Sequence, residues 1–435
     1  MSADPTSQRK RVVIGGVLAI VIVAATATAV LARRSPFQPL SVFARALAAI
    51  EVNYVEPVDQ QSLIYGAIRG LTTALDPHSV FLDPQEYAIL ESDSEGRFAG
   101  VGVEVSTKEG WLTILSVFDG GPAAKAGLQA GDRFLAIEGK EARDIRLYDA
   151  VQLIRGEPGT NVNVTIRREG KEAHIERTLT RAFIDVDPIE MKILDHGVVF
   201  VGIRAFQENT ASLFAEALDQ AVVGLRKRGG VRGVLLDLRD NGGGLLREAV
   251  LVSDEFLSSG VILTTRGRGG ELIREFPARR SGTRPKWPIV VLINERTASA
   301  SEIVAGALSD QGRAVLVGVR TFGKGSVQSI FELPDGSALK LTIARYFTPS
   351  GRSIQAEGIR PDILALGKAE DEEPTPIREE ELDRHLAPTS GGVARREERE
   401  MMPTEAPSGL PDSRTLADDA QAQRGYQELV SRIRE

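Results

Sequence analysis

The stretch IVVLINERTASASEI, residues 289–303, passes from an unbroken apolar run into a cluster of small and polar residues. The run Ile289–Ile293 predicts a buried strand, and the pattern after it predicts a short turn and a helix from about Ser299 to Ser309. Because the first N–H groups of a helix have no partner inside it, a serine at that point lies beside an oxyanion site. Read alone, Ser299 is better explained as an ordinary helix-capping residue.

The same order of strand, turn and helix occurs on the amino-terminal side of this stretch. The run Val231–Leu238 predicts another buried strand, followed by the segment DNGGG (residues 240–244) and a helix from Leu245 to Leu257. A third strand, Ala314–Val319, is predicted after the serine stretch. Strands that alternate with helices indicate a mostly parallel sheet covered on both faces. The glycines lack the Gly-x-Gly-x-x-Gly spacing of a dinucleotide site.

Three further blocks of different composition surround this predicted core. Residues 35–95 have apolar side chains at helical spacing, interrupted at the segment LDPHS, residues 75–79. Residues 96–182 contain short runs of alternating apolar and polar residues, typical of a small β-rich module with two helices. After Gly367 the chain is rich in Glu, Arg, Pro and Ser, which predicts a disordered tail with a candidate helix at Ala420–Arg434.

The N-terminal residues predict a membrane anchor. Val12–Leu31 is a run of twenty residues without a charge, and ~20 apolar residues span a bilayer. Arg9, Lys10 and Arg11 precede the run, so the N-terminus is expected to stay in the cytoplasm and the rest to cross the membrane. A cleaved signal peptide is the alternative. We therefore expect a periplasmic or extracytoplasmic protein, anchored in the cytoplasmic membrane by a single N-terminal helix.

These blocks give predicted bounds for five segments. They are a cytoplasmic stub and anchor over 1–34, a helical dimerisation segment over 35–95, the β-rich module over 96–182, the α/β core over 183–367 and an acidic tail over 368–435.

Charge and composition exclude several classes of function. The formal net charge is −7, and residues 368–435 carry 17 acidic and 10 basic side chains, which accounts for all of it. The remaining chain is neutral, without the basic stripe that nucleic-acid binding needs. With no cysteine, the chain has no disulfide, no thiol nucleophile and no zinc–thiolate site. We expect no cofactor and no metal.

A serine nucleophile needs a base, and the histidines are weak candidates. None of His78, His174, His196 and His385 lies in a signature of Ser-His-Asp hydrolases, and the sequence has no Gly-x-Ser-x-Gly elbow.

The segment TFGKGSVQ, residues 321–328, offers a lysine instead. Lys324 lies between two glycines shortly after a predicted buried strand. Burial there would lower the pKa of the lysine, and a neutral amine can act as a base. The amide of Gln328 is spaced to orient that amine. A loop lysine that faces water explains the same pattern. A phosphate loop does not fit, because the Gly-x4-Gly-Lys-Ser/Thr spacing is absent.

Several motifs together resemble the carboxy-terminal processing proteases, also called tail-specific proteases. These motifs are LDPHS (75–79), DLRDNGGG (237–244), TASASEI (297–303), TFGKGSVQ (321–328) and YFTPSGRSIQ (346–355), and the resemblance covers roughly residues 40–367. It implies a crotonase-like α/β protease core with an inserted PDZ domain. It also implies that Ser299 is the nucleophile, Lys324 the general base and Gln328 the residue that holds it. The oxyanion donors would be the N–H groups of Ala300 and Gly243.

By the same resemblance, residues 96–182 are the PDZ domain. The segment FAGVGV, residues 98–103, resembles a carboxylate-binding loop, in which successive N–H groups bind the C-terminus of a peptide. The predicted substrate-binding residues are Gly100, Val101, Gly102, Val103 and Arg155. Arg155 would sense bound substrate, although a solvated arginine fits equally well.

The function implied is a serine endopeptidase that recognises nonpolar C-terminal tails of proteins and cleaves near them. The expected partners are such C-termini, an adaptor protein and a second copy of the chain. A non-catalytic PDZ scaffold on a protease fold is the main alternative. A crotonase-type acyl-CoA enzyme is a weaker one, because it leaves the PDZ domain and Lys324 without a role.

Overall fold

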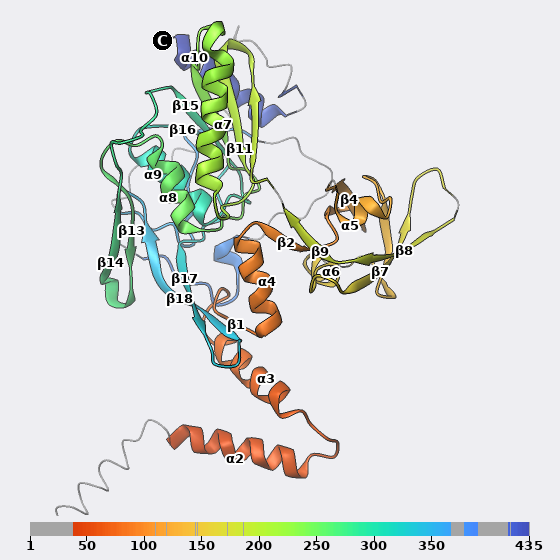
Figure 1. The fold of residues 1–435 in the computed structure, drawn as a ribbon. Coiled ribbons are helices and arrows are strands. Elements are labelled where there is room, and N and C mark those ends of the chain that lie inside the picture. The colour runs from red at the N-terminus through yellow and green to blue at the C-terminus, as the bar shows by residue number, and fades with distance from the viewer. Residues whose placement is uncertain are drawn as a thin grey trace, which may run out of the picture. The chain divides into compact units, whose positions relative to one another are not determined.

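The computed structural model describes residues 38–366 apart from 109, 119, 144, 146, 172 and 186, residues 378–389, and residues 416–434 apart from 418. The chain divides into two compact units, Met1–Gly70 and Leu71–Glu435. The described elements of the first unit are α2 (Gln38–Asn53) and most of α3 (Gln60–Thr73) (Figure 1). With α4 (Pro84–Ser94) in the second unit, they account in part for the helical segment predicted over 35–95.

The predicted localisation is contradicted by the helices that the structure describes. None of them is long and apolar enough to cross a bilayer. The helices α2 and α7 (Thr210–Leu225) have 16 residues each. That is a length of about 24 Å, against roughly 30 Å for the hydrocarbon core. We therefore withdraw the prediction of a periplasmic or extracytoplasmic protein anchored by a single N-terminal helix. The run 12–31, on which it rested, lies outside the described residues.

A six-stranded sheet forms the centre of the second unit, as the alternation of strands and helices predicts. Its strands follow the order β10 (Ile189–Ile193), β11 (Val198–Ile203), β12 (Gly233–Asp237), β15 (Ile289–Ile293), β16 (Val315–Gly318) and β19 (Ile363–Leu364). Every neighbouring pair is parallel except β10 with β11. The carboxyl ends of β12 and β15 therefore meet at one edge, where the glycine cluster and the serine stretch follow them.

Side chains of the central strands alternate between two apolar cores, as expected of a sheet covered on both faces. Val199, Val234 and Ile289 are paired side by side and belong to the first core. The helices whose apolar residues complete this core are α7 (Thr210–Leu225), α8 (Leu246–Asp254) and α9 (Ala300–Asp310).

The opposite face of the sheet is covered by α10 (Ala420–Arg434). Leu235 points to this side and shares a core with Tyr426 and Leu429. At Gly425 the helix lies so close to the sheet that an added Cβ would be 2.6 Å from Leu292 Cδ2. The helix predicted at Ala420–Arg434 is confirmed. The expectation of a disordered tail does not hold for the described residues of 378–389 and 416–434. Glu379 is buried in the first segment, and several apolar side chains of the second belong to the core on this face of the sheet.

A second sheet carries the residues that follow the lysine segment. Its strands are β1 (Val80–Leu82), β18 (Ala338–Phe347), β13 (Val261–Arg266) and β14 (Leu272–Pro277) in that order, and β17 (Ser326–Glu332) pairs with β18. The hairpin β17–β18 thus begins two residues after Lys324, and β1 joins it directly after the LDPHS segment.

The β-rich module has an apolar core of its own. Its sheet contains β3 (Val103–Lys108), β4 (Trp111–Val117), β5 (Arg133–Ile137), β7 (Asn161–Arg167) and β8 (Ile175–Thr180), with β6 (Lys140–Glu141) on β5. Its helices are α5 (Pro122–Lys125) and α6 (Leu147–Ile154). The strands β2 (Arg97–Gly100) and β9 (Ala182–Asp185) pair with each other, so the chain enters and leaves the module side by side, as an inserted domain requires.

Candidate active site

Ser299 lies at the sharp turn between β15 and α9. Its φ of +56° is in the left-handed region, which non-glycine residues adopt at an energetic cost. Asn241 fixes the turn, because its backbone carbonyl oxygen accepts hydrogen bonds from Ala298 N–H at 3.0 Å and from Ser301 Oγ at 3.0 Å. Ser299 therefore stands at the N-terminus of α9, where the sequence predicts it, on a backbone held in a strained conformation.

Gly243 packs directly against this turn. A Cβ added at Gly243 would lie 2.7 Å from Ser299 Cβ and 3.0 Å from Ala300 N, and the φ of +105° also favours glycine. The two predicted oxyanion residues, Ala300 and Gly243, are therefore brought together beside Ser299. The Gly243 N–H, however, donates to Asn241 Oδ1 at 2.8 Å, so in this conformation its hydrogen bond is already made within the protein.

Lys324 lies in the loop before β17, half-buried. Burial, the main cause, and the positive charge of Lys340 lower its pKa to about 8, although nearby carboxylates oppose the shift. The carbonyl oxygen of Lys324 accepts a hydrogen bond from the buried Tyr346 hydroxyl, which fixes the loop against β18. A lysine with this pKa has an appreciable neutral fraction near neutral pH, as a general base needs.

Glu302 ties the serine turn to the lysine loop, and the sequence analysis did not identify it. One carboxylate oxygen, Oε2, accepts from the N–H groups of Ser299 at 2.8 Å and Lys324 at 2.9 Å. The other accepts from Thr321 Oγ1 at 2.5 Å and Gly323 N–H at 2.8 Å. Burial raises the pKa of Glu302 to about 7, and the four donors oppose that rise because they favour the ionised form.

Gln328 lies on β17, four residues after Lys324, and makes no hydrogen bond to the Lys324 amine in the described structure. Its side-chain Nε2 donates to Ser326 Oγ at 2.9 Å and Thr342 Oγ1 at 3.2 Å. Thr342 Oγ1 in turn donates to Asp76 Oδ1 at 3.0 Å. The amide is thus held by the hairpin β17–β18 and by the LDPHS segment rather than by Lys324.

A segment of the tail crosses the lysine loop, and we call residues 378–385 the strap. Arg378 donates to the carbonyl oxygens of Arg320 and Thr321, at 2.9 Å each. At the other end of the strap, Arg384 donates to the carbonyl oxygen of Thr73 at 2.7 Å. The strap therefore joins the loop that carries Lys324 to the residues just before LDPHS.

The buried carboxylate of Glu379 lies at the centre of the strap. One of its oxygens is 2.7 Å from His78 Nε2, and the other accepts from Gln355 Nε2 at 2.7 Å. Gln355 Oε1 accepts from Gly325 N–H at 3.0 Å, next to Lys324. The LDPHS motif is thus connected to the lysine loop twice, through Glu379 and through Thr342.

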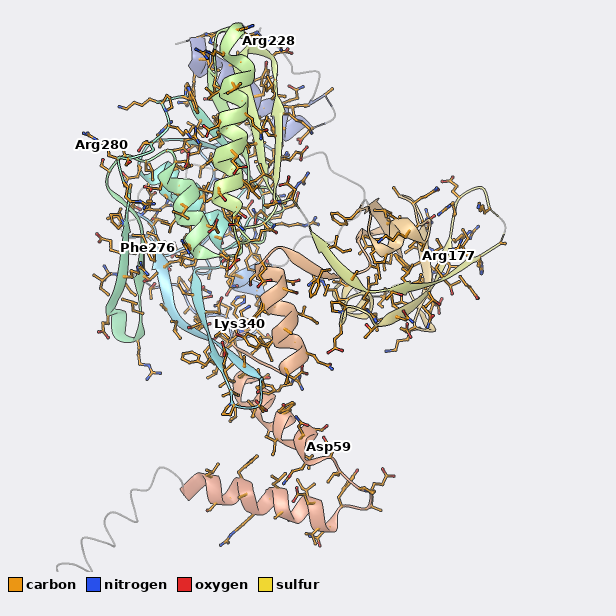
Figure 2. The ribbon with its side chains drawn as sticks, viewed as in Figure 1. Asp59, Arg177, Arg228, Phe276, Arg280 and Lys340 are labelled. Carbon is orange, nitrogen blue, oxygen red and sulfur yellow. The ribbon has the colours of Figure 1, made fainter. Side chains whose placement is uncertain are left out.

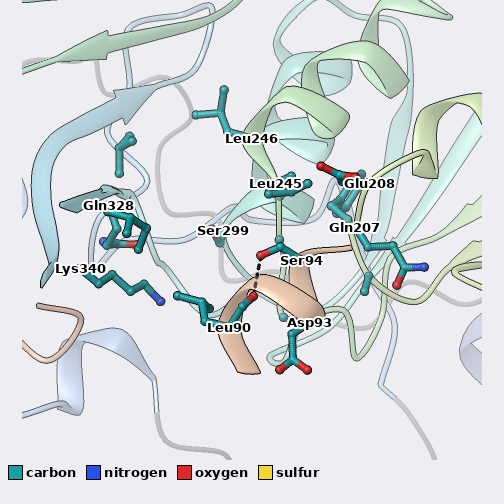
Figure 3. A pocket seen from close by; sticks show the side chains of 18 of the residues that line it. Leu90, Asp93, Ser94, Gln207, Glu208, Leu245, Leu246, Ser299, Gln328 and Lys340 are labelled. Carbon is teal, nitrogen blue, oxygen red and sulfur yellow. Dashed lines mark hydrogen bonds between the residues drawn. The ribbon is translucent and has the colours of Figure 1, made fainter. Parts of the chain in front are cut away.

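A cavity of about 670 Å³ lies beside Ser299 and Lys324. Its lining includes Ser299, Ala300, Gly243, Lys324, Gln328 and Lys340, together with residues of α4 (Figure 3). Among the described residues, no group of His, Asp and Glu is arranged to hold a metal ion. The cavity has the size of a site for part of a peptide chain.

The predicted peptide-binding residues lie in the β-rich module. Gly100 ends β2 and Val103 begins β3, with Val101 and Gly102 in the turn between them. Arg155 follows α6 and donates to Asp93 Oδ2 on α4 at 2.6 Å. Asp93 also lines the cavity, so Arg155 contacts a residue of the cavity wall and is not a purely solvated side chain.

Known protein families match three parts of the chain. The model of peptidase family S41 matches residues 197–365, a PDZ domain model matches residues 113–168, and the model described as the activating protease CtpB N-terminal domain matches residues 24–86. The first two matches fall on the α/β core and on the β-rich module.

Named relatives match most of the chain. It is 39% identical over 333 residues to the carboxy-terminal-processing protease of Bartonella bacilliformis, with 76% of each chain covered. It is 34% identical to the carboxy-terminal processing protease CtpA of Bacillus subtilis, covering 74% of this chain and 68% of that protein. A solved structure named photosystem II D1 C-terminal processing protease is similar at a TM-score of 0.50 and 32% identity, covering 74% of this chain and 92% of the other.

Proposed function

The chain belongs to peptidase family S41, as a serine-type peptidase with a PDZ domain, and we propose that Ser299 and Lys324 carry out its reaction. The proposal is an endopeptidase that binds nonpolar C-terminal tails of proteins and cleaves near them. The core would be crotonase-like, with residues 183–367 as the protease core and residues 96–182 as the PDZ domain.

In the proposed reaction the Ser299 hydroxyl attacks the scissile carbonyl carbon, and the neutral amine of Lys324 takes the hydroxyl proton. The tetrahedral oxyanion accepts a hydrogen bond from the N–H of Ala300, at the positive end of α9. The N–H of Gly243 joins it if its hydrogen bond to Asn241 is released. The lysine then gives its proton to the leaving amine, and water repeats the sequence on the acyl-enzyme.

The observation that carries this proposal is the shared carboxylate of Glu302. It accepts hydrogen bonds from the backbone of both Ser299 and Lys324, which are 25 residues apart in the sequence. A single buried group therefore fixes the two loops to each other. Gln328 enters the proposal as the residue that holds Lys324, although its amide lies on Ser326 and Thr342 here, so that role needs a change of side-chain rotamer.

The PDZ domain is proposed to deliver the substrate. The peptide would add as a strand beside Gly102–Val105, and its carboxylate would bind N–H groups of the loop Gly100–Val103. The pair of Arg155 and Asp93 connects the end of α6 to α4, which lines the catalytic cavity. This contact supports Arg155 as the residue that senses bound peptide. An adaptor and a second copy of the chain remain predictions from the sequence.

The test is cleavage of peptides with nonpolar C-termini, in which the terminal group is a free carboxylate or an amide. We expect cleavage of the free acids, complete loss in Ser299→Ala and Lys324→Met, and retained cleavage in Ser212→Ala, a matched control on the exposed side of α7. Binding of the free acids without cleavage by the unaltered protein would refute the protease and favour the PDZ scaffold.

A further inference from the structure

Lys340 is a second lysine in the catalytic cavity, and the proposed reaction does not use it. It lies on β18, two residues from Thr342, and the side chains of Lys340 and Thr342 share one face of the strand. Tyr346 and Lys340 both line the cavity that contains Ser299. Lys340 is labelled in Figure 2, and Figure 3 shows its amine extended into the cavity, toward Leu90 of α4.

The ammonium group of Lys340 has no carboxylate partner among the residues that the structure describes. Two of the acids that line the cavity, Asp93 and Glu91, have partners of their own. Asp93 pairs with Arg155, and Glu91 interacts with the Tyr87 hydroxyl. Asp76, which contacts the same hairpin through Thr342, accepts hydrogen bonds from Ser79 and Thr342. Burial lowers the pKa of Lys340.

An unpaired, half-buried cation is costly for the folded protein, and here it also opposes protonation of Lys324. An ordinary surface lysine would turn its amine to water instead. The strand holds this one in the cavity, between Ile330 on β17 and Val80 on β1. The missing partner is therefore expected to arrive with the substrate, and the anion that a peptide supplies is a carboxylate.

We infer that Lys340 is a substrate-binding residue that pairs with a carboxylate of the bound peptide close to the scissile bond. This inference rests on the proposed function of the same cavity. The carboxylate is either an acidic side chain of the substrate or a terminal carboxylate close to the cleavage point. Either one would compensate the charge of Lys340 only in the complex, so it would make acidic peptides better substrates than their amide counterparts.

The experiment measures kcat/KM for matched peptides. In one series each position around the scissile bond carries Asp or Asn in turn. In a second series the terminal group near that bond is a carboxylate or an amide. For the unaltered protein we expect the acid to be favoured at one position at least ten-fold. Lys340→Met is expected to bring this acid-to-amide ratio close to one, and Lys340→Glu to favour a peptide with Lys at that position. Lys227→Met, on the exposed turn after α7, is the control for a lost surface charge.

The pH profile supplies a second readout. The charge of Lys340 lowers the pKa of Lys324. A bound carboxylate offsets that charge, so the acidic peptide should shift the rising limb of the kcat profile to higher pH than its amide counterpart does. Equal acid-to-amide ratios in the unaltered protein, Lys340→Met and Lys340→Glu would overturn the inference. If Lys340→Met does not fold, Lys340→Gln takes its place. If Ser299→Ala abolishes cleavage but the acid-to-amide ratio does not depend on Lys340, the inference is refuted and the proposed function stands. If the unaltered protein does not cleave, the proposed function is refuted.

Discussion

The depressed pKa of Lys324 makes a quantitative prediction about activity and pH. With a pKa of about 8, about one-tenth of the lysine is neutral at pH 7 and about nine-tenths at pH 9. If the neutral amine is the base, kcat/KM should rise nearly ten-fold between these pH values and then level off. An unperturbed lysine would be neutral in only about three molecules in ten thousand at pH 7. Burial of Lys324 therefore accounts for a gain of roughly 300-fold in competent enzyme at that pH.

The assay is the initial rate of cleavage of a peptide without groups that titrate between pH 6 and 10. Ser299→Ala supplies the background rate, and circular dichroism at each pH verifies that the protein stays folded. Because the pKa of Glu302 is also raised, to about 7, a requirement for its ionised form would add a further factor of about two to this rise and make the acidic limb steeper than one proton requires. A flat profile from pH 6 to 9, or a midpoint above pH 10, would refute the assignment of Lys324 as the base.

Four other substitutions test the surrounding structure. Lys324→Met should raise the free energy of unfolding, measured in urea, by about 3 kcal/mol at pH 7, because the amine of Lys324 binds a proton more weakly in the folded protein than in the unfolded chain. The gain should fall to about 1 kcal/mol by pH 10. A gain that does not change with pH would contradict this reasoning. Glu302→Gln places amide hydrogens against backbone N–H donors, which disturbs the contact between the serine turn and the lysine loop, so kcat should fall at least about 100-fold. Turnover at the wild-type rate in a stopped assay would contradict this prediction. Gly243→Ala puts a methyl group 2.7 Å from Ser299 Cβ, so cleavage should be lost while calorimetry still shows a cooperative transition. Glu379→Gln weakens the pair with His78 and should lower the free energy of unfolding by about 1–3 kcal/mol, which lowers Tm by several degrees. An unchanged Tm would mean that this contact of the strap adds no stability.

The strands and helices around the site were predictable because their signals are local. The apolar run before Ser299 and the helix after it are read within 15 residues, and the structure places β15 and α9 there. The glycines beside Lys324 and the strand before it were compatible with its burial, but a loop lysine that faces water explained the same pattern. By contrast, Glu302 reads in the sequence as an ordinary acidic residue in the first turn of a helix. Its contacts with the lysine loop form only when segments 21 and 22 residues apart meet.

The strap and the packing of α10 on the sheet were missed for a related reason. Composition averaged over the acidic tail indicates disorder, but Glu379 is buried and Tyr426 belongs to the core. A few well-placed residues among many charged ones carry these contacts, and an average conceals them. The contacts of Gln328 could not be predicted from the sequence either. Its amide donates to Thr342, and Thr342 donates to Asp76, which comes from another part of the chain.

The position of α10 in the chain has a consequence for biosynthesis. A chain leaves the ribosome from its N-terminus, and α10 follows every strand of the sheet that it covers. Until α10 has emerged, the side of the sheet that carries Leu235 and Leu292 faces water. The strap, which holds the loop of Lys324, also emerges after that loop. The nascent chain therefore lacks the contacts of α10 and of the strap until its last segments have been made.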